Sequence, residues 1–155
     1  MLKNQVNQGY EALKKVIDFY IKDNDIKYIS SELAPSTFKG LTNYYNEFNQ
    51  FLVYSGGDHG LLGQEYNIKF RAVHDYMHLT CNLTFKFEDE KRLSLLTQAE
   101  FANIAQNKLN IDNDSICYMI KVIDAEIKGQ IEYYEKNKTY VADQTKFIYG
   151  YLKAV

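Results

Sequence analysis

Residues 65–82, which read EYNIKFRAVHDYMHLTCN, are the stretch that decides our interpretation of the fold. Phe70, Val73, Met77 and Cys81 recur at intervals of three and four residues, which is the spacing of one face of an α-helix. The pattern predicts a central helix over this stretch, with an apolar stripe that faces a core.

Helical spacing of apolar residues continues on both sides of this stretch. We expect further helices at about residues 4–23, 36–46, 88–109, 112–137 and 143–152. The run Phe51–Tyr54 is instead β-prone, and the glycine-rich residues 55–60 after it indicate a loop. The connections are short, which favours antiparallel neighbours. The sequence therefore predicts an all-α bundle of five or six helices, a single domain over residues 1–155, with little or no strand.

The composition is typical of one soluble globular domain. The 155 residues are 46% hydrophobic and 25% charged, so the chain is long enough to bury a core without a disulfide or a metal. Its net charge of −2 gives no support for nucleic-acid binding driven by bulk charge. No segment approaches the roughly 20 apolar residues that span a bilayer, and the first eight residues have no apolar signal-peptide core. We therefore expect a cytoplasmic protein without a membrane partner.

The cysteines and tyrosines have no assigned chemistry. Cys81 and Cys117 are too few to define a disulfide framework, and we expect two reduced, mostly buried thiols. Fourteen tyrosines and no tryptophan could equip a contact surface, because tyrosine combines a rigid ring with a hydroxyl. A compositional bias that also enriches Asn, Lys and Ile is the interpretation that we favour.

His74, Asp75 and His78 are the chemically informative residues of the central helix. Residues four apart project from the same face of a helix, so the two imidazoles should lie one turn apart, with the carboxylate on the adjoining flank. Both histidines share the face of Phe70 and Met77, so they should point toward the core. An unsatisfied buried polar group costs about 1–3 kcal/mol. A shared metal ion, or carboxylates from facing helices, would satisfy both rings.

Glu100 and Glu126 are the carboxylates that we expect opposite these histidines. Both lie on inward stripes of their predicted helices, and buried glutamates are rare unless they are paired. Metal sites in helical bundles are built from histidines and carboxylates that converge from several helices. We expect a divalent metal, Zn, Mn or Fe, held by His74, His78, Glu126 and Glu100. Cys81, one turn past His78, could add a softer donor that favours Zn.

A metal-free core network is the alternative for the same residues. In that case His74 would bond to Glu126 or Glu100, and Asp75 would hold a neighbouring side chain such as Arg71. The sequence leaves both alternatives open.

Arg71 and His59 each have a local and a functional interpretation. Arg71 lies one turn before Asp75, so it could form an ion pair there, or its planar guanidinium could bind a phosphate or carboxylate beside the site. His59 lies in the glycine-rich loop, which could be a surface turn or could deliver His59 over the two histidines.

The His74-Asp75 pair, followed by His78, resembles the signature of the HD-type phosphohydrolases. The resemblance implies an all-α metalloenzyme that cleaves phosphoesters, often of nucleotides. It also implies an upstream histidine and a downstream aspartate, for which His59 and Asp124 are the candidates in this chain.

A second resemblance covers more than half of the chain. The pattern N-x-x-F-R-A-x-H-D-x-x-H over residues 67–78 is similar to that of small uncharacterised proteins of tailed phages. The similarity continues at Phe87-Glu88-x-Glu90, Glu126-x-x-Gly129-Gln130 and Asp143-Gln144. It implies a phage-encoded protein, which would act in the host cytoplasm.

Together these patterns predict a small helical metal-binding protein that acts as a metal-dependent hydrolase on a small phosphorylated substrate. Glu126 would activate a metal-bound water, and Asp75 would be a ligand or orient one. Arg71 and His59 would contact the substrate. The alternative is a non-catalytic phage protein that binds a host factor or belongs to the virion, with the histidines and glutamates as a structural core network.

Overall fold

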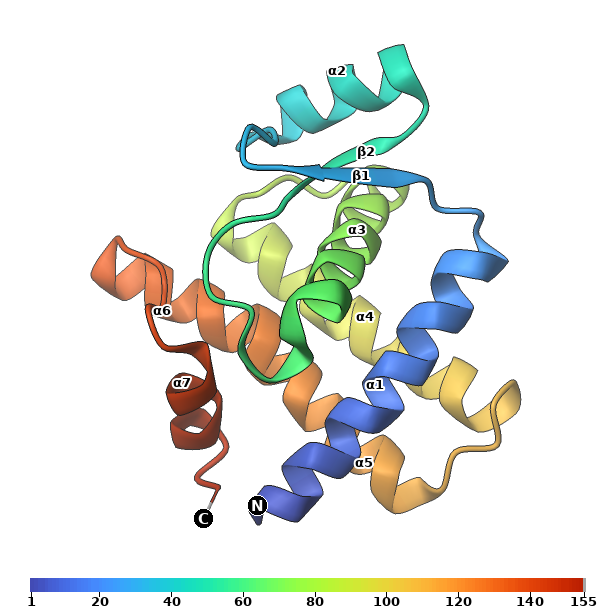
Figure 1. Ribbon diagram of the computed structural model, residues 1–155, viewed down its shortest axis with the longest axis vertical. Helices are drawn as coiled ribbons and strands as arrows, with labels where there is room; N and C mark the ends of the chain where they lie inside the picture. Colours follow the sequence, from blue (N-terminus) through green and yellow to red (C-terminus); the bar gives the residue numbers. More distant parts are fainter. Residues whose placement is uncertain (155) are drawn as a thin grey trace.

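Helix α3, from Gly63 to Cys81, lies at the centre of the computed structural model, which describes residues 1–154 (Figure 1). Around it, the described part of the chain forms six further α-helices, two short strands, one 3-10 turn and one π-helical turn. In chain order these elements are α1 (Lys3–Asp23), β1 (Tyr28–Ser31), α2 (Phe38–Phe48), β2 (Phe51–Tyr54), the 3-10 turn η1 (Gly60–Leu62), α3, α4 (Phe87–Asn107), α5 (Asn113–Asp124), the π-helical turn η2 (Ala125–Gly129), α6 (Gln130–Asn137) and α7 (Gln144–Tyr151). The predicted all-α class is confirmed.

The two strands form a small parallel pair at one end of the molecule. Tyr28 lies opposite Phe51 and Ser31 lies opposite Tyr54, and α2 makes the crossover between the strands. The run Phe51–Tyr54 is therefore extended, as predicted, and its partner is a segment that the sequence left ambiguous. Phe51 and Val53 are buried on the side that faces α3. The segment after β2 consequently starts alongside α3.

Helices α1 and α5 make the closest helix pair of the core. Leu13 and Ile17 of α1 and Met119 of α5 are fully buried. A Cβ on Gly9 would lie 2.8 Å from the backbone carbonyl of Tyr118, so only glycine permits this approach. The buried apolar side chains join in one hydrophobic cluster, to which every helix except α6 contributes.

The predicted helix over residues 112–137 is interrupted by a π-helical turn, which the spacing of its apolar residues did not indicate. It starts at its expected cap, where the Asp112 carboxylate accepts the amide of Ser115 at 2.8 Å. After α5, however, the backbone widens into the π-helical turn Ala125–Gly129 before α6 begins. A π-helical turn shifts the angular position of every later side chain, and such turns are frequent at functional sites.

The expected burial of the two cysteines is wrong. Cys81 and Cys117 are both exposed rather than buried. Leu96 is 45% exposed, because the buried stripe of α4 follows Leu93, Thr97 and Phe101 instead. Over residues 1–154, none of the helices combines the length and the apolar character that crossing a membrane requires.

Candidate metal centre

Helix α3 presents His74 and His78 toward the first turn of α4. The two residues are four apart, so their rings lie on one face, with centroids 4.5 Å apart and planes at 90°. His78 is completely buried, whereas 23% of the His74 side chain is exposed. The pair therefore reaches from the core to the edge of the surface.

The turn between α3 and α4 fixes the ring of His78. Asn82 ends α3 with a φ of 52°, a left-handed conformation that asparagine tolerates, and the Leu83 amide then donates to the His78 carbonyl at 3.0 Å. The carbonyl of Leu83 lies 2.7 Å from Nδ1 of His78, and Phe85 packs edge-on against the same ring. A carbonyl only accepts, so Nδ1 carries a proton and donates it. A neutral His78 therefore presents the lone pair of Nε2 to its other neighbours.

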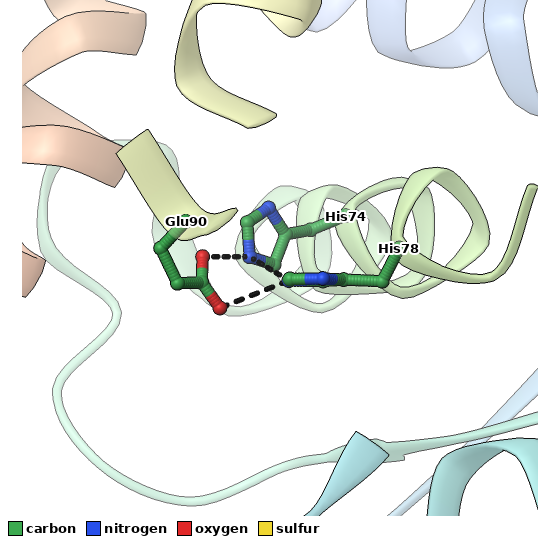
Figure 2. A group of neighbouring side chains, drawn as sticks. All are labelled: His74, His78 and Glu90. Carbon is green, nitrogen blue, oxygen red and sulfur yellow. Dashed lines mark hydrogen bonds and ion pairs between the residues drawn. The ribbon is translucent and has the colours of Figure 1, made fainter. Parts of the chain in front are cut away.

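Glu90, in the first turn of α4, supplies the carboxylate. Its Oε2 lies 2.9 Å from Nε2 of His74, and its Oε1 lies 2.9 Å from Nε2 of His78 (Figure 2). Glu90 is only 9% exposed. Burial alone would raise the pKa of this carboxyl, but the two imidazoles hold its pKa well below the usual range. Glu90 is consequently an ionised acceptor.

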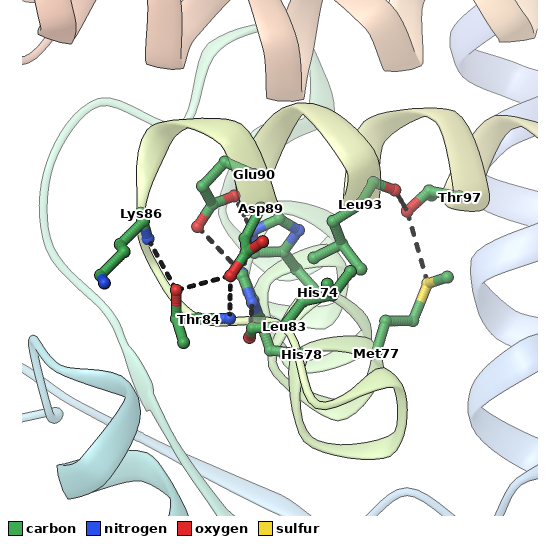
Figure 3. Close-up of polar contacts among 10 residues, drawn as sticks. All are labelled: His74, Met77, His78, Leu83, Thr84, Lys86, Asp89, Glu90, Leu93 and Thr97. Carbon is green, nitrogen blue, oxygen red and sulfur yellow. Dashed lines mark hydrogen bonds and ion pairs between the residues drawn. The ribbon is translucent and has the colours of Figure 1, made fainter.

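Asp89 holds the start of α4 in place beside the cluster. The amide and the hydroxyl of Thr84 both donate to Oδ2 of Asp89, at 3.0 and 2.7 Å, and the Lys86 amide donates to the Thr84 hydroxyl at 3.3 Å (Figure 3). These hydrogen bonds from Thr84 lower the pKa of Asp89. The same short turn therefore orients His78 at the end of α3 and Glu90 at the start of α4.

Without a metal, this cluster requires a buried ion pair. Nε2 of His74 lies 3.0 Å from Nε2 of His78, and both nitrogens face Glu90. For both rings to donate to the carboxylate, the fully buried His78 would have to be an imidazolium, with two N–H groups pointing into the same small space. Nδ1 of His74 is also buried, and within residues 1–154 it has no hydrogen-bond partner. This nitrogen has no partner whether Nε2 of His74 bonds to Glu90 or binds a metal, so it does not decide between the two arrangements.

A metal ion fits the converging nitrogens and oxygens of these three side chains. Ligand nitrogens and oxygens lie about 2.1 Å from zinc, so neighbouring ligands of one ion are about 3.0–3.4 Å apart. The observed separations of 2.9–3.0 Å need only small side-chain shifts to reach that range. The bond from Nδ1 of His78 to the Leu83 carbonyl is the kind of contact that orients a metal-bound histidine. His74, His78 and Glu90 can therefore hold a metal ion, and two imidazoles with one carboxylate suit Zn, Mn or Fe.

The carboxylate that lies beside the two histidines is Glu90, whereas the expected ligands Glu126 and Glu100 lie elsewhere. Glu126 accepts hydrogen bonds from the Tyr10 hydroxyl and from the side chain of Gln130, the latter at 2.8 Å. The π-helical turn that carries Glu126 directs it to this separate polar contact with α1. Glu100 is exposed, because it lies one residue away from the buried stripe of α4.

The environment of Glu126 is unusual for a carboxyl. Burial is the largest influence and raises its pKa to about 7, against the lowering effects of Tyr10, Arg71 and Gln130. Glu126 therefore takes up a proton near neutral pH, away from the histidine cluster.

Asp75 and Arg71 lie on the flank of the cluster but do not pair directly. Asp75 carries a pKa raised to about 7, mainly by burial, with Glu90 acting in the same direction and with His78 and Arg71 opposing. The guanidinium of Arg71 donates to the carbonyls of Tyr54 and Gly56, at 2.7 and 2.8 Å. The local ion pair expected between Arg71 and Asp75 is absent from the contacts of the described residues.

The remaining expected residues lie outside the cluster. Nδ1 of His59 is 3.1 Å from the side-chain nitrogen of the buried Asn67, two turns before His74 on α3. Asp124 accepts from Gln98 and Tyr151. Cys81 is exposed at the end of α3 and is not one of the clustered ligands. Their predicted contributions to substrate or metal binding stay predictions without support from this geometry.

Glu90 is the residue that sequence reasoning missed. Its signal was present: Glu90 lies at the head of the stripe that continues through Leu93, Thr97 and Phe101 at helical spacing. The predicted inward residue Glu100 is close to this stripe in sequence but is rotated out of the core.

Two surface depressions lie away from the cluster. One, of about 200 Å³, is lined by residues around Asn24, Phe51 and Tyr76. Another, of about 350 Å³, lies between α1 and the start of α5, around Gln8 and Ser115. Neither includes a residue of the cluster.

Comparisons of the chain with protein-family models, curated proteins and solved structures gave no significant match. The resemblances to HD-type phosphohydrolases and to tailed-phage proteins therefore stay predictions.

Proposed function

We propose that this protein is a divalent-metal-dependent hydrolase whose ion is held by His74, His78 and Glu90. The observation that carries the proposal is the convergence of three side chains: Nε2 of His74 and Nε2 of His78 lie 3.0 Å apart, and each lies 2.9 Å from one oxygen of Glu90. The proton of His78 is committed to the Leu83 carbonyl, so the free lone pair of this ring points at the other two ligands.

The ligand set supports catalysis over a purely structural ion. Structural zinc sites are generally closed by four protein ligands, whereas catalytic sites use three and leave a position for water. This cluster has three members among the described residues, and one of them, His74, reaches the surface. A metal ion at such a site lowers the pKa of its water to about 7 and stabilises charge on a leaving oxygen.

We propose a phosphoester as the substrate class, because its anionic oxygens suit the ion position that the protein leaves free. Asp75, which follows His74 in the sequence and has a pKa raised to about 7 mainly by burial, is our candidate for the group that would accept a proton from the water. Glu126 has no part in this step because Tyr10 and Gln130 hold it elsewhere.

Elemental analysis of untagged protein tests the metal centre. Wild type should contain about one equivalent of Zn, Mn or Fe, and His74→Ala should contain little, while its circular dichroism stays helical. His59→Ala is the matched control, because His59 lies outside the cluster, and it should keep its metal. A wild type that stays metal-free after incubation with each ion would remove the proposal. A loaded protein that fails to cleave any generic phosphoester would remove the substrate class but leave the metal site.

A second candidate is a non-catalytic protein in which the cluster is a core network. The observation in its favour is the complete burial of His78 and the position of both depressions away from the cluster. In that case His78→Ala should lower the thermal stability equally with and without added metal.

A further inference from the structure

A row of aromatic rings leads from the start of α2 to the histidine cluster. In order, the rings belong to Phe38, Phe85, His78 and His74. The centroids of Phe38 and Phe85 are 6.2 Å apart with ring planes at 72°, and those of Phe85 and His78 are 4.7 Å apart with planes at 71°. Edge-to-face contacts at such separations are favourable. A helix outside the cluster is thus joined to one of its ligands through two ring contacts.

Phe85 covers the ring of His78. Phe85 is partly exposed, whereas the His78 ring that it contacts is completely buried. Phe85 belongs to the turn between α3 and α4, whose residues Leu83, Thr84 and Lys86 are drawn in Figure 3. The carbonyl of Leu83 in the same turn accepts the hydrogen bond from Nδ1 of His78 at 2.7 Å. Phe85 therefore helps to keep water from this bond, and hydrogen bonds are stronger in such surroundings than in water.

Phe38 is the first residue of α2, and the cap of that helix fixes its backbone. The hydroxyl of Thr37 accepts the amide of Gly40 at 3.0 Å, as expected of a residue that caps a helix. The carbonyl of Phe38 then accepts the hydroxyl of Thr42 at 2.9 Å. The start of α2 is thus a defined support from which the Phe38 ring reaches Phe85.

Helix α2 is held to the rest of the molecule by few buried side chains. It lies on the outer side of the strand pair (Figure 1) and contacts β2 and α3. Within Phe38–Phe48, Leu41 is the one buried residue, and Phe48 at the far end is 52% exposed. Elements with little buried apolar surface open at a lower free energy than core helices do. A single ring contact at the start of α2 can therefore change how firmly this helix docks.

We propose that Phe38 and Phe85 are positioning residues of the metal centre, which hold the His78 ring with Nε2 toward the ion and couple the docking of α2 to metal binding. Phe85 acts on the ring directly, and Phe38 acts through Phe85. If docked α2 favours metal binding by some factor, bound metal must favour docked α2 by the same factor. The coupling rests on the proposed metal centre, whereas the hold on His78 does not.

Nuclear magnetic resonance of the metal-free protein tests the hold on His78. In wild type, the Nδ1 proton of His78 should exchange slowly with water, because the ring is buried and this proton is hydrogen-bonded. Phe85→Leu, which keeps an apolar side chain but removes the ring, should speed this exchange at least about tenfold. Phe38→Leu should speed it by about two- to tenfold, the effect of one edge-to-face contact.

Two further variants separate positioning from general packing. Phe38→Tyr keeps an aromatic ring and should restore the wild-type exchange rate. Phe48→Leu is the matched control, because it removes a ring from the other end of α2, where Phe48 contacts Tyr44, and it should leave the exchange unchanged. An unchanged rate in Phe85→Leu would overturn the hold on His78. Equal effects of Phe38→Leu and Phe48→Leu would overturn the role of Phe38.

Zinc binding tests the coupling. In competition with a chromophoric chelator, Phe38→Leu should bind zinc about two- to tenfold more weakly than wild type and Phe48→Leu. Saturating zinc should slow the hydrogen exchange of the α2 amides of wild type by the same factor. Equal zinc affinities in Phe38→Leu and wild type, with faster exchange at His78, would overturn the coupling. A wild type that binds no zinc would overturn the proposed metal centre and the coupling together, and the metal-free measurement would still decide the hold on His78.

Discussion

Replacement of Glu126 by Gln should make the protein more stable at high pH, although it removes a charged group. Glu126 is held by Tyr10 and Gln130 in the π-helical turn, and burial raises its pKa from 4.5 to about 7. Glutamine keeps the shape of the side chain and stays neutral at every pH. The variant therefore isolates the cost of ionising this buried carboxyl.

The raised pKa fixes the sign and size of the effect. Between pH 4.5 and about 7, the folded protein holds a proton that the unfolded chain has released, so the stability of wild type falls as pH rises. The full stability from this group is present below pH 4.5, and about 3 kcal/mol of it is lost once the pH exceeds 7. Glu126→Gln lacks this loss.

Urea unfolding of both proteins from pH 4 to pH 8 measures the difference. Relative to wild type, Glu126→Gln should gain about 3 kcal/mol in the free energy of unfolding over this range. Glu11→Gln, at a side chain that is 67% exposed, should show no such trend. A difference between Glu126→Gln and wild type that is independent of pH would refute the reasoning. Stabilisation by added metal in wild type but not in Glu126→Gln would place Glu126 in a metal site after all.

Two further predictions test the packing of α1 and the turn beside the cluster. Gly9→Ala should lower the free energy of unfolding by about 1–3 kcal/mol, because its Cβ would meet the Tyr118 backbone at 2.8 Å. Gly150→Ala is the control, because a Cβ at Gly150 would meet no atom of the described residues within 4 Å, and it should be neutral or slightly stabilising. Equal effects of the two substitutions in urea unfolding would contradict the close approach of α1 and α5 at Gly9. Asp89→Ala should weaken zinc binding by about tenfold in calorimetric titration, because it releases Thr84 and the first turn of α4. An unchanged zinc affinity would show that this turn does not orient Glu90.

The sequence predicted the elements whose signal is local. The spacing of Phe70, Val73 and Met77 identified α3, and the same spacing put His74 and His78 on one face. The pairing of β1 with β2 could not be predicted in the same way, because it joins two four-residue strands across a helix. Pairing of that kind depends on tertiary contacts that have no local pattern.

The identity of the third ligand depended on helix phase, which is where the sequence reasoning failed. Glu100 and Glu126 both looked inward on ideal helices. An error of one residue moves a side chain by about 100°, which exposes Glu100, and the π-helical turn carries Glu126 to Tyr10. Glu90 satisfies the same chemical requirement, a carboxylate facing two buried imidazoles. The need for a partner was thus predictable, whereas the choice among glutamates required the structure.

Competition titration with a chromophoric zinc chelator tests the central claim most directly, in wild type, Glu90→Gln and Glu126→Gln. Removal of Glu90 should weaken zinc binding by at least about a hundredfold, because it deletes a ligand rather than a supporting contact. Removal of the Glu126 charge should change the affinity by less than about threefold, since this carboxyl lies outside the cluster. A large loss in Glu126→Gln with none in Glu90→Gln, or no zinc binding by wild type, would contradict the account.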